Sequence, residues 1–157
     1  LSGAYACARV LLAKAASRMR RGGFSAKALA LWLTDRDSAG WYGEERFLPT
    51  ADDPSLLASL SRLFGHAERE NPAHTRLRSV HVTLHDLVAA GEQAEDLFGF
   101  TAEAQIKRRQ EYLSVLADRL NAHYRGPLLH WGPWAEIPGG YAGAKIAFNR
   151  IPDAEDF

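Results

Sequence analysis

Apolar residues in the first part of the chain recur at helical spacing. Between residues 4 and 21 they are separated by three or four positions, a pattern typical of an amphipathic helix with one apolar stripe. The stripe consists of Ala8, Leu11, Leu12, Ala15, Ala16 and Met19. Gly22 and Gly23 follow directly, and glycine often ends a helix because it adopts the left-handed conformation at little steric cost. The pattern therefore predicts a helix over residues 4–21.

Three later segments alternate apolar and polar residues with a period of two, which predicts strands that each bury one face. Residues 27–35 and 41–48 flank a turn at 37–40, and together they predict a hairpin. Residues 76–87 predict a third strand. The apolar positions on the buried side are Leu29, Leu31 and Leu33 in the first strand and Val80, Val82 and Leu84 in the third.

A second helix is predicted between the hairpin and the third strand. Asp53 is expected to cap its N-terminus and Pro54 to occupy its first helical position, where proline is well tolerated. Asn71 and Pro72 are expected to end it. Its apolar stripe consists of Leu56, Leu57, Leu60, Leu63 and Phe64.

The element order over residues 1–90 is therefore helix, strand, strand, helix, strand. One more strand before the first helix would complete a βαββαβ unit, an α+β two-layer sandwich of the split βαβ type with both helices on one sheet face. We expect that strand upstream of Leu1, because the chain starts directly at the first helix and its only methionine is Met19. The other face of the sheet is then predicted to be open.

The chain changes character after residue 90. Residues 91–101 are acidic and apolar without periodicity, which is typical of a linker. A third helix is predicted over 102–124, with Thr101 as its N-cap. Its apolar set is Ile106, Leu113, Leu116, Ala117 and Leu120. Residues 126–143 are rich in glycine and proline and predict an irregular loop, and 144–151 predict a short last strand, so 102–157 form a C-terminal appendage.

Composition places the chain among ordinary globular domains, but its charge is unevenly distributed. The 157 residues are 46% hydrophobic and carry no net charge. The first 34 residues nevertheless contain six basic and no acidic side chains, which bears on binding partners. Cys7 is the only cysteine, which fits a reducing compartment. No apolar run is long enough to cross a membrane and no secretory signal is evident, so a cytoplasmic location is expected.

The predicted open face of the sheet carries mostly small, hydroxyl-bearing or aromatic residues. One interpretation is an ordinary solvated face, as is common in antiparallel sheets. The other is a surface that a phosphate chain can approach closely and hydrogen-bond. Strand parity assigns to this face Ala28, Ala30, Trp32, Thr34 and Arg36 from the first strand, and Ser79, His81, Thr83 and His85 from the third.

Several of these segments together resemble a known protein family. They are the helix over 9–22, the strand over 28–33, Glu45-Arg46-Phe47 in the returning strand, Asp52-Asp53-Pro54, and the strand over 80–87. In order and spacing, over residues 1–98, they resemble the C-terminal little-finger domain of Y-family translesion DNA polymerases, in particular the UmuC-like and ImuB-like branch.

The resemblance implies both a fold and a function. Little fingers have the βαββαβ arrangement and lay their open sheet face on primer–template DNA, which they hold through backbone phosphates. The resemblance and strand parity together make Trp32, Thr34, Arg36, Ser79, His81 and Thr83 candidate DNA contacts. Arg18, Arg20 and Arg21 at the end of the first helix join them as cations that could steer DNA, or could instead form an ordinary solvated helix face.

The same resemblance implies that this chain is not itself catalytic. Polymerases hold two Mg²⁺ ions with carboxylates of a palm domain, which in the family lies far upstream of the little finger. Asp35 and Asp37 are spaced like metal ligands, but we interpret them as turn residues. His81 and His85 share a strand face without further ligands, so no metal site and no cofactor is predicted for this chain.

A short segment of the linker resembles the peptide with which bacterial polymerases bind the sliding clamp. Gln93 precedes Leu97 and Phe98, two apolar side chains that could fill a clamp pocket. Ala94 stands where leucine is usual and the spacing is one residue longer, so Leu97 and Phe98 could instead pack on the domain itself. Clamp binding leads to a second hypothesis, in which the chain is a protein-interaction module of an inactive, ImuB-like adaptor.

Overall fold

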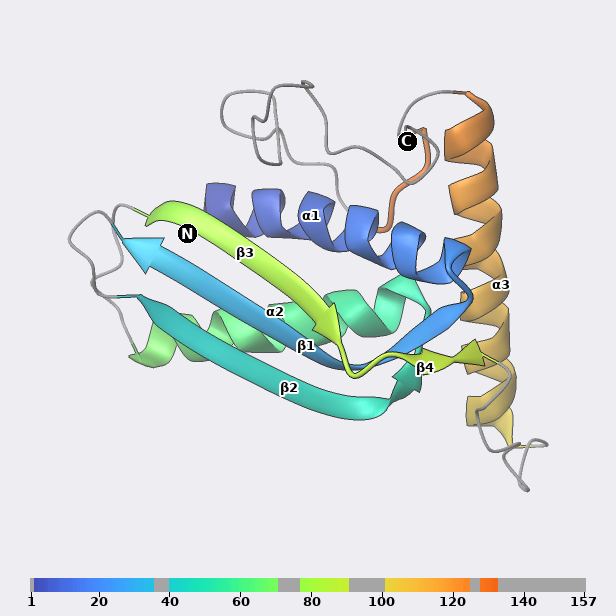
Figure 1. Cartoon of the computed structure of the whole chain (residues 1–157), viewed down its shortest axis with the longest axis horizontal. Coiled ribbons are helices and arrows are strands. Elements are labelled where there is room, and N and C mark those ends of the chain that lie inside the picture. The colour runs from blue at the N-terminus through green and yellow to red at the C-terminus, as the bar shows by residue number, and fades with distance from the viewer. Residues whose placement is uncertain (1, 36–39, 71–76, 91–100, 125–127, 133–157) are drawn as a thin grey trace.

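The computed structural model describes residues 2–35, 40–70, 77–90, 101–124 and 128–132 (Figure 1). These residues form three helices and four strands. In chain order they are α1 (Ser2–Arg21), β1 (Phe24–Asp35), β2 (Trp41–Thr50), α2 (Asp53–Glu70), β3 (Leu77–His85), β4 (Val88–Ala89) and α3 (Ala102–His123). The predicted α+β class is confirmed, and the predicted elements within the described residues occur in the predicted order, with the two-residue β4 as an additional strand. The linker over 91–100 and the loop and strand predicted after residue 132 lie outside the described residues.

The strands form one antiparallel sheet in the order β2-β1-β3, with the two-residue β4 pairing to the start of β1. Since β2 and β3 are both antiparallel to the strand between them, they run parallel to each other, and α2 connects them in a split βαβ unit. Asp86, at a φ of 52°, lies between β3 and β4. Gly23, at a φ of 74°, lies where the sequence predicts the end of α1. The strand predicted upstream of Leu1 stays a prediction.

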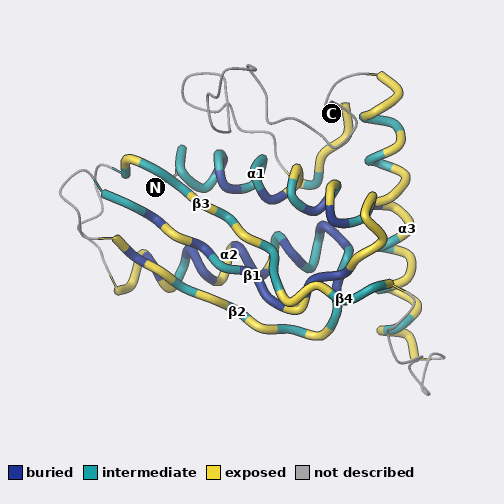
Figure 2. Tube along the Cα trace, in the orientation of Figure 1, coloured by how far each residue is buried: buried dark blue, intermediate teal, exposed yellow. Residues whose placement is uncertain are grey.

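Helices α1 and α2 cover one side of the sheet, and α3 stands at one end of it (Figure 1). Leu29, Leu31 and Leu33 of β1 are fully buried against these two helices, as the alternating pattern predicts. Leu12 of α1 and Leu60 of α2 are buried in the same cluster. Figure 2 shows the buried positions concentrated between the helices and the sheet. The core is therefore the interior of a two-layer sandwich.

The predicted cap of α2 is wrong by one residue. The side chain of Asp52, not Asp53, accepts a hydrogen bond from the backbone N–H of Ser55 at 2.7 Å, and Asp52 is fully buried. Asp53 begins the helix, and its carboxylate faces Arg20 of α1 instead. From the sequence, either of the two adjacent aspartates before Pro54 could cap the helix. Asp53 is engaged by Arg20, which explains why Asp52 is the cap.

Several hydrogen bonds and an ion pair join helix α3 to α1, α2 and β2. Asp118 accepts two hydrogen bonds from Arg20, and Ser114, the only buried residue of α3, accepts one from the backbone N–H of Asp53 at 3.0 Å. Lys107 donates to the carbonyl of Pro49 at 2.6 Å. The apolar set predicted for this helix does not form a buried stripe, since Ile106 is 56% exposed and Leu113 and Leu116 remain over a third exposed.

The described segment 128–132 returns from α3 to α1. Asn121 exchanges two hydrogen bonds with the backbone of Leu129, at 2.8 and 2.9 Å. Arg9 of α1 donates to the carbonyl oxygen of Trp131. These hydrogen bonds join the segment 128–132 to α3 and α1.

Candidate nucleic-acid interface

The sheet face turned away from α1 and α2 is built from three strands in register. Cross-strand pairing places its residues in rows that run from β2 through β1 to β3. The rows are Arg46–Ala28–His85, Glu44–Ala30–Thr83 and Tyr42–Trp32–His81, followed by the pair Thr34–Ser79. We call these residues the open face. In the central row, β1 and β3 carry the short side chains of Ala30 and Thr83, and β2 carries Glu44.

Five of the predicted DNA contacts lie together on the open face: Trp32, Thr34, Ser79, His81 and Thr83. Strand parity therefore assigned the face correctly, although whether these residues touch DNA stays a prediction. Arg36 lies outside the described residues. Tyr42, Glu44 and Arg46 of β2 also lie on this face and were not among the predicted contacts. The alternation within residues 41–48, with Trp41 buried, could have placed these three on the same face.

One end of the open face holds a network of charged side chains. Arg46 contacts Glu44 at 3.1 Å and Asp86 at 2.7 Å, and His85 lies 3.6 Å from Glu44 and 3.5 Å from Asp86. A hydrogen bond from His85 and the charge of Arg46 lower the pKa of Asp86, which keeps this carboxylate ionised. Two carboxylates therefore hold Arg46.

The other end of the open face is aromatic. The rings of Trp32 and Tyr42 meet edge to face, with centroids 6.2 Å apart and planes at 77°. The hydroxyl of Tyr42 donates to Glu44 at 2.9 Å, and this hydrogen bond raises the pKa of Tyr42. On the other side of Trp32, His81 Nε2 and Ser79 Oγ are 3.2 Å apart. Neighbouring groups thus hold the two rings beside Trp32 in place.

The structure separates the predicted helix cations from this face. Arg18, Arg20 and Arg21 lie on α1, behind the sheet. The side chain of Arg20 is only 5% exposed and is bound by Asp53 and Asp118, so the prediction that it contacts DNA is incompatible with its position. Arg18 and Arg21 are exposed on the helix layer and do not share a surface with the open face.

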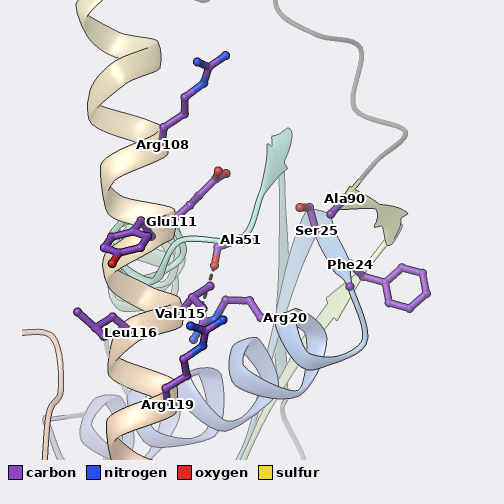
Figure 3. A pocket seen from close by; sticks show the side chains of 12 residues that line it. Arg20, Phe24, Ser25, Ala51, Ala90, Arg108, Glu111, Val115, Leu116 and Arg119 are labelled. Carbon is purple, nitrogen blue, oxygen red and sulfur yellow. Dashed lines mark hydrogen bonds between the residues drawn. The ribbon is translucent and has the colours of Figure 1, made fainter.

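A shallow hollow of about 430 Å³ lies between α3 and the start of β1 (Figure 3). It is lined by Arg20, Ser25, Arg108, Glu111 and Arg119, together with apolar groups. Burial raises the pKa of Glu111, and the carboxyl of Asp52 adds to the rise against the charges of Lys107 and Arg108. This hollow lies apart from the rows of the open face.

The described residues contain neither the predicted clamp-binding peptide nor a group of side chains suited to a metal ion. Gln93, Leu97 and Phe98, the predicted clamp contacts, lie outside the described residues. Within those residues, no three His, Cys, Asp or Glu side chains gather so that they could hold a metal ion. No helix among them has the length and apolar character needed to span a membrane.

Comparison with known proteins identifies the family. The model of the impB/mucB/samB family C-terminal domain matches residues 2–97, which include α1, α2 and the entire sheet. The curated proteins and the solved structures give no match. Helix α3 lies beyond the matched range. Through residues 2–97, the chain belongs to the impB/mucB/samB family, and these residues form the C-terminal, little-finger domain of a Y-family polymerase.

Proposed function

We propose that this chain is the DNA-binding domain of a translesion polymerase or polymerase-like repair protein, and that the open face grips primer–template duplex through backbone phosphates. The observation that carries the proposal is a helix-free sheet face with short side chains at its centre. Ala30 and Thr83 leave room for a sugar–phosphate strand, and Thr34, Ser79 and Thr83 supply hydroxyl groups that can donate to phosphate oxygens. Contacts of this kind are independent of base sequence.

The charge of the open face predicts how this binding depends on salt. Each phosphate neutralised by a cation contributes about 0.9 to the slope of log affinity against log salt. Among the described residues in the rows of the open face, Arg46 is the one arginine or lysine, and Glu44 and Asp86 already hold it. Arg46 should therefore contribute about one to the slope, and each further cation that contacts a phosphate should make it steeper.

The proposal assigns no chemical step to this chain. Nucleotide transfer with Mg²⁺ would belong to a palm domain elsewhere in the protein. The little finger would act in the cytoplasm by holding the duplex in position, and its contribution would appear as affinity and processivity.

The test is a titration of labelled primer–template duplex at about 50 and 200 mM salt. Thr83→Glu places a carboxylate at the centre of the open face, where it would repel phosphates, and should reduce binding at least tenfold. Ser61→Glu is the matched control, since Ser61 is exposed on α2 behind the sheet. Absence of binding at the lower salt, or equal losses in the two variants, would refute duplex binding by this face.

The exposed apolar side chains of α3 favour a second candidate function, that of a protein-interaction module in an inactive polymerase homologue. Ile106, Tyr112 and Leu116 are 56%, 67% and 38% exposed. Under this hypothesis the C-terminal part of the chain docks a sliding clamp or another replication partner. Replacing Leu97 and Phe98, the predicted clamp contacts, with alanine should then abolish capture by purified clamp, and Ile106→Glu should abolish capture of a partner that docks on α3. If the unsubstituted chain captures no clamp, clamp docking is refuted.

A further inference from the structure

Three rings form a row across the open face. Trp32 of β1 lies opposite Tyr42 of β2 and opposite His81 of β3. Trp32 is 54% and Tyr42 56% exposed, and His81 is exposed as well. Large aromatic side chains are rarely left this open on a sheet, because covering them with a partner recovers the free energy of apolar burial. We call Trp32, Tyr42 and His81 the aromatic row.

The aromatic row is held in place before any ligand arrives. A Cβ atom at position 40 would lie only 3.0 Å from Nε1 of Trp32, so Gly40 leaves space for the indole to lie against the backbone. The hydroxyl of Tyr42 is fixed by Glu44, and the ring of His81 lies within hydrogen-bond distance of Ser79. These contacts restrict the side chains before binding, which reduces the entropy that binding costs.

The row differs chemically from what a continuous duplex offers. Within a duplex both faces of each base are covered by neighbouring bases, so a sheet that lies on the helix meets phosphates, sugars and groove edges. An unpaired base exposes its ring face, and stacking on aromatic side chains is the usual way in which open sheets and grooves hold single strands. The hydroxyl groups of Thr34 and Ser79 on one side and of Thr83 on the other suit the flanking backbone.

We propose that the aromatic row binds unpaired bases of single-stranded DNA next to the duplex, and that the open face therefore recognises the junction between single and double strand. This inference rests on the proposed function, because it divides the same face into a part for duplex backbone and a part for unpaired bases. The aromatic row and the row of Arg46 are separated by one row, which consists of Glu44, Ala30 and Thr83. The carboxylate of Glu44 is paired with Arg46 and accepts a hydrogen bond from Tyr42, so a DNA strand that crosses both parts would pass over Ala30 and Thr83.

The experiment compares two labelled DNAs of equal duplex length, one blunt and one with a single-stranded overhang of about six nucleotides. Binding of the whole chain to each is measured by fluorescence anisotropy. The overhang should tighten binding by about 5- to 150-fold if one base stacks. Trp32→Ala should remove most of this preference by weakening overhang DNA far more than blunt duplex, while Trp32→Phe should retain part of it. Leu48→Ala is the control, since Leu48 is an 80% exposed apolar residue outside the rows.

Each outcome decides the inference. A blunt duplex that binds as tightly as the overhang DNA, or a Trp32→Ala variant that weakens both equally, overturns the aromatic row as a base-stacking site and leaves duplex binding standing. Binding to the overhang DNA alone supports the row and refutes the duplex grip. If neither DNA binds, both proposals fail. Unchanged circular dichroism of Trp32→Ala confirms that a lost preference does not come from unfolding.

Discussion

The guanidinium group of Arg20 meets the carboxylate of Asp53 end-on, with Nη1–Oδ1 and Nη2–Oδ2 both 3.1 Å long. The same guanidinium donates to both oxygens of Asp118, at 2.6 and 2.9 Å, and to the carbonyl of Ala51 at 2.7 Å. One arginine of α1 thus joins the start of α2 to the middle of α3. Because the Arg20 side chain is 5% exposed, this ion-pair cluster is structural and not a surface for DNA.

Replacing Arg20 with methionine should strongly destabilise the domain. The substitution retains most of the apolar stem but leaves Asp53 and Asp118 without their cation, and removing one partner of a buried pair typically costs about 3 kcal/mol or more. Urea unfolding followed by circular dichroism measures the loss. Arg109→Met on the exposed side of α3 is the control and should change stability by less than about 0.5 kcal/mol. Similar effects of the two variants would show that the cluster contributes little.

Gly43 in β2 has no room for a side chain. A Cβ atom there would lie 2.2 Å from the nearest ring carbon of Trp41, which is buried and donates to Glu70 at 2.7 Å. Gly43→Ala should therefore displace the Trp41 indole, weaken its hydrogen bond and cost about 1–3 kcal/mol, as is usual for overpacking. Thermal unfolding monitored by circular dichroism measures the loss.

The matched control for this substitution has the opposite expected sign. Gly65 lies within α2, and the nearest atom to an added Cβ is Nη1 of Arg69 at an ordinary 3.5 Å. Gly65→Ala should therefore stabilise the domain by about 0.5–1 kcal/mol, because alanine loses less backbone freedom in a helix. If Gly43→Ala were neutral or stabilising as well, the tight packing of Trp41 on β2 would be refuted.

The carboxyl of Glu111 should make stability depend on pH. Its Oε1 is buried without a hydrogen-bond partner among the described residues, as is Oδ2 of Asp52, and burial raises its pKa from the ordinary value of 4.5. The folded protein then holds this proton more tightly than the unfolded chain does. Stability from this group is therefore greatest below pH 4.5 and falls as the pH rises through the raised pKa.

Glu111→Gln removes the buried charge and supplies an amide that can donate to Asp52. At about pH 7.5 the variant should be more stable than the parent by on the order of 1 kcal/mol, the usual net value of one hydrogen bond. The difference should shrink at about pH 4.5, where Glu111 itself becomes protonated. Urea unfolding at both pH values measures it, with the exposed Glu68→Gln as control. A difference that is the same at both pH values would contradict the assignment to Glu111.

Local pattern was enough to predict the sheet and which way its side chains point. Period-two alternation placed Leu31 inside and Trp32 outside, because a strand that buries one face allows only one register. The same reasoning reached Ser79, His81 and Thr83 on β3. The same reasoning did not identify Tyr42, Glu44 and Arg46. Apolar and polar residues alternate less clearly in β2, and the position of these three residues depends on the pairing of β2 with β1.

Long-range ion pairs could not be predicted in the same way. The partners of Arg20 lie 33 and 98 residues away, so in the sequence it is one more cation in a basic helix. The ion pair between Arg20 and Asp53 also explains why Asp52, and not Asp53, caps α2. Helix α3 was predicted with its N-cap, and Thr101 accepts from the N–H of Ala104 as expected. The hydrogen bonds that join α3 to the domain leave no periodic pattern of apolar residues in the sequence, so these contacts could not be predicted.

Arg46 should bind phosphate more strongly once its competing carboxylates are reduced. Asp86→Asn removes the 2.7 Å ion pair, and asparagine tolerates the positive φ at this position. Duplex affinity should then rise a few-fold, whereas Arg46→Gln should lower it and reduce the salt slope by about one. Anisotropy titrations over a salt series measure both effects.

Arg62→Gln is the matched control. Arg62 forms a 2.5 Å ion pair with Glu45, and this pair does not lie on the open face. If Arg62→Gln weakens binding as much as Arg46→Gln, the effect is one of net charge, and Arg46 is not a phosphate contact.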